Sequence, residues 1–184
     1  MWQADFSEFK TASEGIWQLG GIVDYAAKVA LACPVTVTQT ADDLIAAIAN
    51  AELLLGMPLI EDCVDSKTGE IEPVVIVSDS GPAMKSTTVA KWFKNRPKVT
   101  HVRTGHRSPH TNGVIERWFQ SLKYERLYRH DIGTGTDLAG HGYDFTDEYN
   151  SISPHQTLDW QRPIDAYLNP ETLNQKPPET EQQT

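Results

Sequence analysis

The sequence predicts an α/β fold built on a mixed β-sheet, and three observations support this prediction. Strand-like segments fill most of the first forty residues, and two more lie between residues 74 and 103. Helix-like segments alternate with these later strands, which is the pattern of an α/β protein. With 184 residues, 39% of them hydrophobic, the chain is long and apolar enough to bury one ordinary core.

Three strands are expected before the first helix. Residues 1–10 alternate loosely between apolar and polar side chains, and residues 16–25 and 28–38 are two further runs of β-forming residues. Because the connections between them are short, we expect an antiparallel meander. Pro34 lacks a backbone N–H, which favours an edge position or a bulge in the third strand.

The first helix is expected to run from residue 40 to residue 55. Thr40 is a suitable N-cap, and Asp42 and Asp43 suit the positive end of the helix dipole. Gly56 is a typical residue for the end of a helix. The polar stretch 61–72 contains a turn signal, so we expect a loop or small hairpin there.

The middle of the chain alternates between strands and helices. Residues 74–77 are four consecutive β-formers, as expected of a strand covered on both faces. Ser86 is expected to cap a helix that ends before Pro97, and residues 99–103 are expected to form a short strand.

A long helix is expected to follow, with Asn112 as its cap. After it we expect a glycine-rich gap around residues 133–142, a helix over residues 144–151, and an extended or looped finish. The last residues are polar and lack aromatic side chains, so we expect the tail, residues 169–184, to be disordered.

The charge of the chain is unevenly distributed. The net charge of −9 by itself argues against a nucleic-acid partner. Residues 85–129, however, contain 11 of the 16 basic residues and only 2 of the 25 acidic residues, a local charge of +9. A basic segment on an acidic body is expected of a protein that binds a phosphate backbone. The ordinary alternative is a solvated, charged helix face.

Membrane, secreted and zinc-binding proteins are disfavoured. No apolar run approaches the roughly 18 residues that cross a bilayer, and the N-terminus does not resemble a signal peptide. Cys33 and Cys63 are widely spaced and fit two reduced thiols. His106 and His110 flank Pro109, which disfavours the helix that would align them, so they fit loop histidines better than zinc ligands.

Three acidic residues lie at positions where a carboxylate could take part in a reaction. Asp79 follows a buried strand, and open α/β sheets place their ligand chemistry at the carboxyl ends of strands. Asp5 lies within a strand flanked by aromatic residues, where a carboxylate is costly to bury without a cation. Glu116 lies in the first turn of the long helix, on a polar ridge with Gln120 and Lys123.

Together, three carboxylates suit a magnesium-dependent reaction at phosphorus. Magnesium takes oxygen ligands and keeps several waters, so a few carboxylates and a substrate phosphate complete its coordination. Two such ions about 3.5 to 4 Å apart can activate the attacking oxygen and stabilise the leaving oxygen of an in-line displacement. Taken singly, Asp79 also fits a turn residue and Glu116 a partner of the helix dipole, and both explanations stay open here.

Five short motifs follow one another along the chain: Trp2-x-x-Asp5-Phe6-Ser7, Val77-Ser78-Asp79-Ser80-Gly81-Pro82, Ser108-Pro109-x-Thr111-Asn112-Gly113-x-x-Glu116-Arg117-x-x-x-x-x-Lys123-x-Glu125, Glu148-Tyr149-Asn150-x-x-x-Pro154-His155-x-x-Leu158 and Arg162-Pro163-x-x-x-Tyr167. In this order they resemble the catalytic core of insertion-sequence transposases and retroviral-type integrases, the DDE enzymes. The 36 residues between Asp79 and Glu116 are close to that family's usual interval. The last two motifs look like the closing motif of the bacterial transposase branch.

This resemblance implies a ribonuclease H-like fold, with a mixed five-stranded sheet and helices on both faces, in a catalytic core that spans residues 1–168. It implies DNA strand cleavage and strand transfer in transposition or DNA integration. Asp5, Asp79 and Glu116 would be the catalytic residues and the ligands of Mg²⁺ or Mn²⁺, with two ions expected. The side chains expected to contact DNA are Lys85, Arg107, Asn112, Arg117 and Lys123.

Three features depart from the family pattern. Ser80 stands where the family usually has Asn, and Ser153 where the closing motif usually has Arg, and either change could weaken DNA contacts. Such transposases normally carry an N-terminal helix-turn-helix region that recognises the element's ends, whereas here Met1 lies four residues before Asp5. We therefore expect a homo-oligomer or a partner polypeptide with a DNA-recognition domain, in the bacterial cytoplasm at the nucleoid and without a membrane partner.

Two other functions stay open on the sequence. The chain could be a catalytically idle transposase fragment that binds DNA, or a full-length transposase, as a regulator. It could also be a plain ribonuclease H-type nuclease that only hydrolyses. Metal-dependent cleavage would distinguish an active enzyme from the idle fragment. Joined DNA products would distinguish a strand-transfer enzyme from the plain nuclease.

Overall fold

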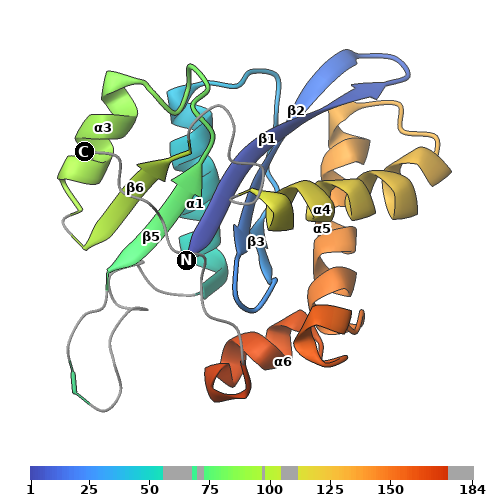
Figure 1. Cartoon of the computed structure of the whole chain (residues 1–184). Coiled ribbons are helices and arrows are strands. Elements are labelled where there is room, and N and C mark those ends of the chain that lie inside the picture. Colours follow the sequence, from blue (N-terminus) through green and yellow to red (C-terminus); the bar gives the residue numbers. More distant parts are fainter. Residues whose placement is uncertain (56–67, 70–72, 97, 105–111, 174–184) are drawn as a thin grey trace.

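The computed structural model describes residues 1–55, 68–69, 73–96, 98–104 and 112–173. These residues form a mixed β-sheet that carries helices on both faces, as predicted (Figure 1). The strands are β1 (Trp2–Thr11), β2 (Gly15–Asp24), β3 (Ala30–Ala32), β4 (Val35–Thr36), β5 (Val74–Ser78) and β6 (Val99–Arg103). The α-helices are α1 (Ala41–Leu55), α3 (Thr87–Lys94), α4 (Gly113–Ser121), α5 (Gly135–Ser151) and α6 (Pro163–Leu168).

The sheet has the strand order β3-β2-β1-β5-β6. Strands β1, β2 and β3 form the expected antiparallel meander, and β1-β5 and β5-β6 are parallel pairs. The third predicted strand is split at Pro34, which lies between β3 and the two-residue strand β4. Both pieces pair with β2 alone and form the edge of the sheet, so the edge position that Pro34 favoured is confirmed. The register also shifts between Ile22 and Val23, at Leu31 of β3. Because of β4, the described part of the sheet has six strands instead of five.

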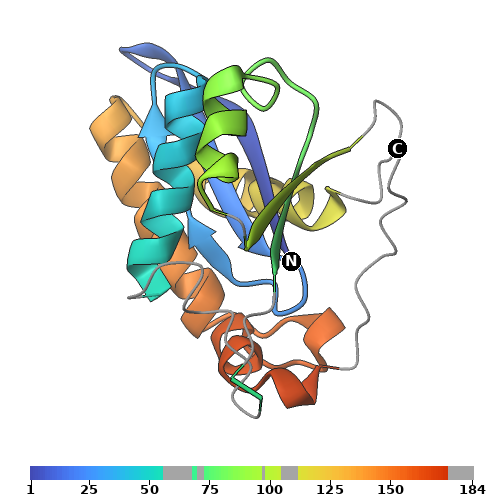
Figure 2. The same ribbon diagram turned by 90° about the vertical axis from the view of Figure 1, so that its left-hand side faces the viewer.

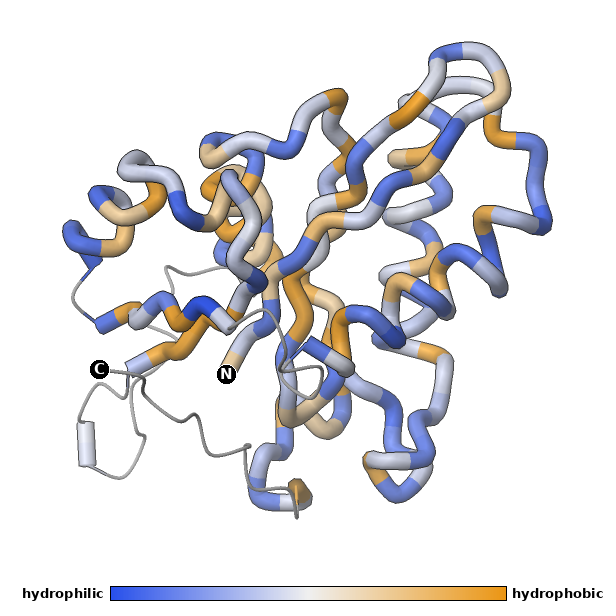
Figure 3. The backbone as a smooth tube through the Cα atoms, turned by 45° about the horizontal axis from the view of Figure 1, so that its top comes forward, coloured by the Kyte–Doolittle hydropathy of each residue, from blue (hydrophilic) through white to orange (hydrophobic). Residues whose placement is uncertain are grey.

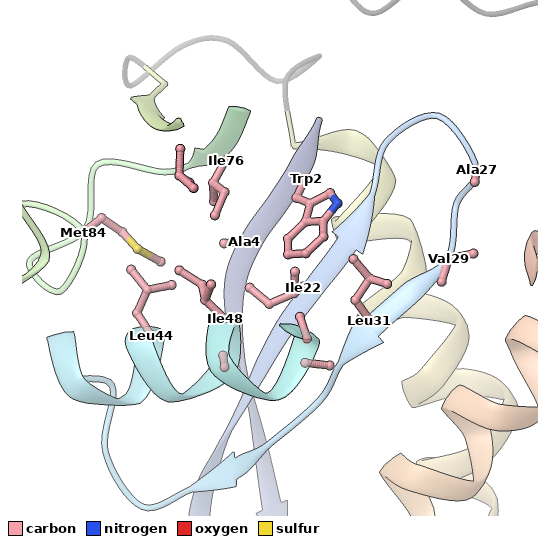
Figure 4. Packing of buried hydrophobic residues seen from close by; sticks show 14 of the residues in the cluster. Trp2, Ala4, Ile22, Ala27, Val29, Leu31, Leu44, Ile48, Ile76 and Met84 are labelled. Carbon is pink, nitrogen blue, oxygen red and sulfur yellow. The ribbon is translucent and has the colours of Figure 1, made fainter. Parts of the chain in front are cut away.

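One face of the sheet packs against α1 and α3, which lie side by side (Figure 2). Trp2, Ala4, Ile22 and Ile76 point from the strands toward this layer, where Leu44 and Ile48 of α1 meet them (Figure 4). Successive residues of a strand point to opposite faces of the sheet, so the neighbours of these residues along each strand point toward the other helix layer. Figure 3 shows the apolar stretches of the central strands inside the molecule.

The opposite face packs against α4 and α5. Leu19 and Val23 of β2 lie in one buried cluster with Ile115 and Trp118 of α4 and Leu138 of α5. The two aromatic residues of α4, Trp118 and Phe119, are thus core residues. This layer is the one that carries Glu116, so its contacts with the sheet position the candidate site.

Two helix starts in the first half of the chain agree with the prediction. Thr40 Oγ1 accepts the backbone N–H of Asp43, and Ser86 Oγ accepts those of Thr88 and Val89. Asn112 occupies the N-cap position of α4, but its side chain makes no capping hydrogen bond, so that part of the prediction is wrong.

The long helix changes its winding after Ser121. It continues as a π-helix, η1 (Leu122–Arg126), and a 3₁₀ turn, η2 (Leu127–Arg129). The N–H of Leu127 bonds to the carbonyl of Leu122, five residues back. Both leucines are buried, and a wider π-turn keeps two residues with this spacing on the same side of the helix. A uniform α-helix would turn one of them away from the core.

The expected glycine-rich gap is wrong, because α5 begins at Gly135. Thr134 and Asp137 form a capping box at its start. A Cβ on Gly135 would lie 2.4 Å from the Trp17 ring, so this glycine lets α5 approach the sheet closely. Glycine here serves close packing of the helix.

The looped finish is also wrong, since α6 forms over Pro163–Leu168. Pro163 suits the first turn of a helix, where a missing N–H costs nothing. Most of the expected loop at 61–72, His106, His110, Cys63 and the tail from residue 174 lie outside the described residues. Within the described part, no helix is both long and apolar enough to cross a bilayer.

Candidate metal centre

Asp5 and Asp79 each follow one residue of a paired position in the sheet. The parallel strands β1 and β5 pair Trp2 with Ile76 and Ala4 with Ser78. The next residue along each chain is an aspartate, Asp5 after Ala4 and Asp79 after Ser78. The sheet register thus brings together two acids that are far apart in sequence.

The first turn of α4 is fixed beside these aspartates by Gln3. This side chain is wholly buried, and its Oε1 accepts the backbone N–H of Ile115 at 2.9 Å. Gln3 and Asp5 are two residues apart on β1, so their side chains leave the same face of the strand. Ile115 directly precedes Glu116, so this hydrogen bond positions the third acid.

A close contact between α4 and β2 also holds this helix next to Asp5. Gly21 is paired with Asp5 across the β1-β2 ladder. A Cβ on Gly21 would lie 2.7 Å from the Phe119 ring and 3.1 Å from Ile115 Cδ1. A glycine at this point is what allows α4 to lie close against the sheet next to Asp5.

Asp5 lies in the electrostatic field of the other two acids. Burial is the largest cause that raises the pKa of Asp5, and the charges of Asp79 and Glu116 add to it; with the opposing hydrogen bond from the Phe6 N–H, the pKa is raised to about 6. A buried acid surrounded by like charges is a common feature of functional sites. A cation among the three acids would offset this repulsion.

The side chains do not meet at a single point. Asp5 Oδ1 accepts the Phe6 N–H at 2.8 Å, and Asp79 Oδ1 accepts the Gly81 N–H at 3.1 Å. Glu116 is exposed on the first turn of α4. Among the described residues, no three His, Cys, Asp or Glu side chains are arranged as a metal site. Because like charges repel, each aspartate turns to a backbone N–H of its own segment.

The segment after β5 is tied to the segment after β6. Ser80 Oγ donates to the carbonyl of Thr104 at 2.8 Å, and the Thr104 N–H donates to the carbonyl of Ser78 at 2.8 Å. Asp79 lies between Ser78 and Ser80 in the chain, so these bonds hold the residues on both sides of it. Ser80, which departs from the family pattern, therefore has a structural role in holding the Asp79 segment.

The five side chains expected to contact DNA differ in their surroundings. Lys85 and Arg117 are exposed, whereas Asn112 is buried and its Oδ1 has no hydrogen-bond partner among the described residues. Lys123 is half-buried, and burial lowers its pKa, an effect that Glu8 opposes. Arg107 lies outside the described residues.

Sequence reasoning missed Gln3 and Gly21. A buried glutamine in a strand is the one signal that could have identified Gln3, because a polar side chain there needs a partner. The partner of Gln3 lies 112 residues away, so the sequence could not name it.

Comparison with known proteins finds a match to part of the chain. A family model described as an integrase core domain matches residues 97–163, a range that includes Glu116 and the closing motif as far as Pro163, but not Asp5 or Asp79. No curated protein matches the sequence.

Several solved structures are similar to the chain. A chain of the simian T-cell lymphotropic virus intasome has a TM-score of 0.70 and 18% identity, covering 99% of this chain and 59% of that one. The HTLV-2 integrase catalytic core with magnesium, in its dimeric form, has a TM-score of 0.63 and 19% identity, covering 89% and 92%. The BIV integrase catalytic core has a TM-score of 0.60 and 19% identity, covering 92% and 94%. This chain thus spans 59% of the length of the first of these.

The fold is therefore the ribonuclease H-like fold of retroviral integrase catalytic cores. The matched segment, residues 97–163, is similar to an integrase core domain. The bacterial branch stays a prediction.

Proposed function

We propose that this protein cleaves and joins DNA strands in transposition or DNA integration, using Asp5, Asp79 and Glu116. The observation that carries the proposal is the sheet register, which pairs Ala4 with Ser78, the residues that directly precede Asp5 and Asp79. The bond from the Ile115 N–H to Gln3 supports it, because it fixes the helix turn that bears Glu116 beside them. The pKa of Asp5, raised first by burial and then by the other two acids, also supports a shared site.

The donor set fits a divalent cation. Three carboxylates supply the oxygen ligands that Mg²⁺ or Mn²⁺ prefers, and substrate phosphate and water complete the coordination. To ligate an ion, Asp79 gives up one hydrogen bond from the Gly81 N–H, and Asp5 one from the Phe6 N–H. The HTLV-2 neighbour is described in complex with magnesium, and we extend that metal to this chain.

Two bound ions would lower the charge on the scissile phosphate and stabilise the attacking and leaving oxygens. The chain itself supplies position and charge. Water attacks a phosphodiester in line and displaces the 3′-oxygen of the neighbouring nucleotide, which leaves as a free 3′-hydroxyl. That hydroxyl then attacks a phosphodiester of a second duplex and displaces its 3′-oxygen, without a covalent bond to the protein. Arg117 is exposed one residue after Glu116, and Lys85 is exposed after the Asp79 segment. Both suit contacts to DNA phosphate. The other proposed contacts are Lys123, Asn112 and Arg107. Contacts to phosphate position DNA but carry no sequence information.

We also propose that the protein acts as an assembly. The HTLV-2 core is described in dimeric and trimeric forms, and the viral chain of the first comparison is part of an intasome. By analogy, the partners would be DNA and either further copies of this chain or a polypeptide that carries a DNA-recognition domain. The assembly would work at the bacterial nucleoid.

A strand-transfer assay tests the function. The native chain and Asp79→Asn are incubated with labelled duplex oligonucleotides and Mg²⁺ or Mn²⁺, and products are separated by size. We expect shortened and joined products from the native chain, and none from the variant. Asp42→Asn is the matched control, because Asp42 is an exposed acid in the first turn of α1, which packs on the face of the sheet opposite to α4.

The other outcomes separate the alternatives. Metal-dependent cleavage without joined products would favour a ribonuclease H-type nuclease. DNA binding without any cleavage would favour the idle-fragment function. Equal cleavage by the native chain and Asp79→Asn would exclude the proposed site.

A further inference from the structure

Two exposed tyrosines lie where the long helix changes its winding. Tyr124 is in the π-helical segment η1 and Tyr128 in the 3₁₀ turn η2. The side chains are 66% and 60% exposed, and their ring centroids are 5.3 Å apart at an interplanar angle of 69°. Among the aromatic pairs in the described residues, this is the pair in which both rings are exposed. π-Helical segments inside helices are frequent at functional sites.

Other parts of the fold hold this pair in place. The Tyr128 ring contacts Phe9 of β1, with 5.8 Å between ring centroids. Nε of Arg129 donates to the backbone carbonyl of Tyr124 at 3.0 Å, so the exposed guanidinium is held at the helix turn that bears the two rings. The Tyr128 ring is thus packed against β1, and a cation is held on the same segment of chain.

The position of the pair relative to the acids follows from β1. Phe9 and Asp5 are four residues apart, so they lie on the same face of the strand. The α4-η2 segment crosses this face with Ile115 bound to Gln3 near one end and Tyr128 against Phe9 at the other. Tyr124 follows Glu116 by eight residues, or about 12 Å at the rise of a helix. That distance corresponds to roughly three or four stacked nucleotides.

We propose that Tyr124 and Tyr128 form a stacking platform for unpaired DNA bases a few nucleotides from the carboxylates. This inference rests on the proposed function. Aromatic side chains beside a positively charged track are the usual way in which proteins bind single-stranded DNA without sequence preference. Paired bases are already stacked inside a duplex, so an exposed ring pair selects unpaired ones.

The surroundings favour DNA over an apolar protein partner. Lys123 directly precedes Tyr124, and Arg129 directly follows Tyr128, so a basic residue is next to each tyrosine in the chain. Glu125 and Arg129 are exposed, and their charges interrupt any continuous apolar patch around the rings. A protein interface core would be depleted of such charges, whereas DNA phosphates would be attracted to the cations.

Binding of a labelled oligodeoxythymidine, measured by fluorescence anisotropy without divalent metal, tests the platform. We expect Tyr124→Ala with Tyr128→Ala to raise Kd by about tenfold or more, the usual cost of losing one stacked base. The double Phe variant keeps both rings and should bind as the native chain does. Tyr143→Ala is the matched control, because Tyr143 is 74% exposed on α5, outside the ring pair.

An abasic deoxyribose-phosphate strand of the same length separates stacking from charge. The native chain should bind the thymidine strand more tightly than the abasic strand, and the double Ala variant should bind both equally. Equal binding of the two strands by the native chain, no binding of either, or unchanged binding by the double Ala variant would overturn the platform.

This binding assay, compared with the strand-transfer assay on the native chain and Asp79→Asn, distinguishes this inference from the proposed function. If the chain does not cleave DNA but the Ala variants lose oligodeoxythymidine binding, the platform stands and the enzymatic function fails. If the chain cleaves and the Ala variants bind normally, the platform fails and the enzymatic function stands.

Discussion

Gln3 Oε1 and the Ile115 N–H form a buried hydrogen bond of 2.9 Å that joins the first strand to the first turn of α4. Each partner is next to a carboxylate of the candidate site. Gln3 is two residues before Asp5, and Ile115 is one residue before Glu116. The spacing between these two acids therefore depends on a glutamine that takes no part in the chemistry.

Replacing Gln3 with Leu leaves the buried Ile115 N–H without its acceptor. We expect the free energy of unfolding to fall by about 1–3 kcal/mol, the usual cost of an unsatisfied buried group. Because the first turn of α4 is released, metal affinity should also fall. Gln18→Leu is the control, since Gln18 is also buried in the hairpin but its amide bonds to Glu8. It should lower stability in urea unfolding while metal affinity is retained; equal losses of affinity in both variants would contradict a positioning role.

Asp5→Asn should make the protein more stable and inactive. Burial and the neighbouring acids raise the pKa of Asp5 from 3.8 to about 6, so its charged form is disfavoured in the folded state. Between these two values the folded chain binds more protons than the unfolded one, and stability falls as pH rises. Removing the charge should therefore raise the free energy of unfolding at pH 7, by about 1–3 kcal/mol. Urea unfolding without metal measures this; a destabilised variant would argue against repulsion among the acids.

His101 should make the fold sensitive to mild acid. Burial, and secondarily the charge of Arg103, lowers the pKa of His101 to about 4, and its Nε2 lies 2.8 Å from Ser78 Oγ. A histidine with a lowered pKa contributes stability that is present above pH 6.5 and is lost as pH falls toward 4. The titration of Asp5 changes stability in the opposite direction over much of this pH range. The contributions of Asp5 and His101 are therefore measured separately, in variants of each residue. We expect His101→Gln to flatten the fall in stability between pH 6.5 and 4; an unchanged pH profile would exclude this role.

Gly21→Ala should push α4 away from the sheet. The new Cβ would lie 2.7 Å from the Phe119 ring, which cannot move freely in the core. Overpacking of this kind typically costs about 1–3 kcal/mol, and we expect weaker metal binding as well. Gly140→Ala is the control, because nothing lies within 4 Å of its Cβ position on α5. In a helix this change should be neutral or stabilising by up to about 1 kcal/mol. Thermal unfolding and metal titration of both variants provide the comparison.

The sequence predicted the parts of the fold that local pattern determines. The β1-β2-β3 meander, β5, β6 and the capped starts of α1 and α3 follow from β-forming runs and from Thr40 and Ser86. It failed where packing overrides propensity. Gly135 and Gly142 looked like loop residues, but both are part of α5, and Gly135 allows this helix to lie against Trp17.

The candidate site was predictable as three acids but not as a geometry. The order and spacing of Asp5, Asp79 and Glu116 pointed to one chemistry, and the register of β1 and β5 brings the two aspartates together. The hydrogen bond of Gln3 and the close approach at Gly21 depend on contacts between distant segments. No local pattern carries that information.

The most direct test of the central claim is divalent metal binding by the native chain, Asp79→Asn and Asp42→Asn. Mg²⁺ and Mn²⁺ are titrated calorimetrically, with a short DNA duplex present to supply phosphate oxygens. We predict binding by the native chain and by Asp42→Asn, and at least a tenfold loss of affinity in Asp79→Asn. Binding of equal affinity by all three proteins, or binding by none of them, would contradict a metal site formed by Asp5, Asp79 and Glu116.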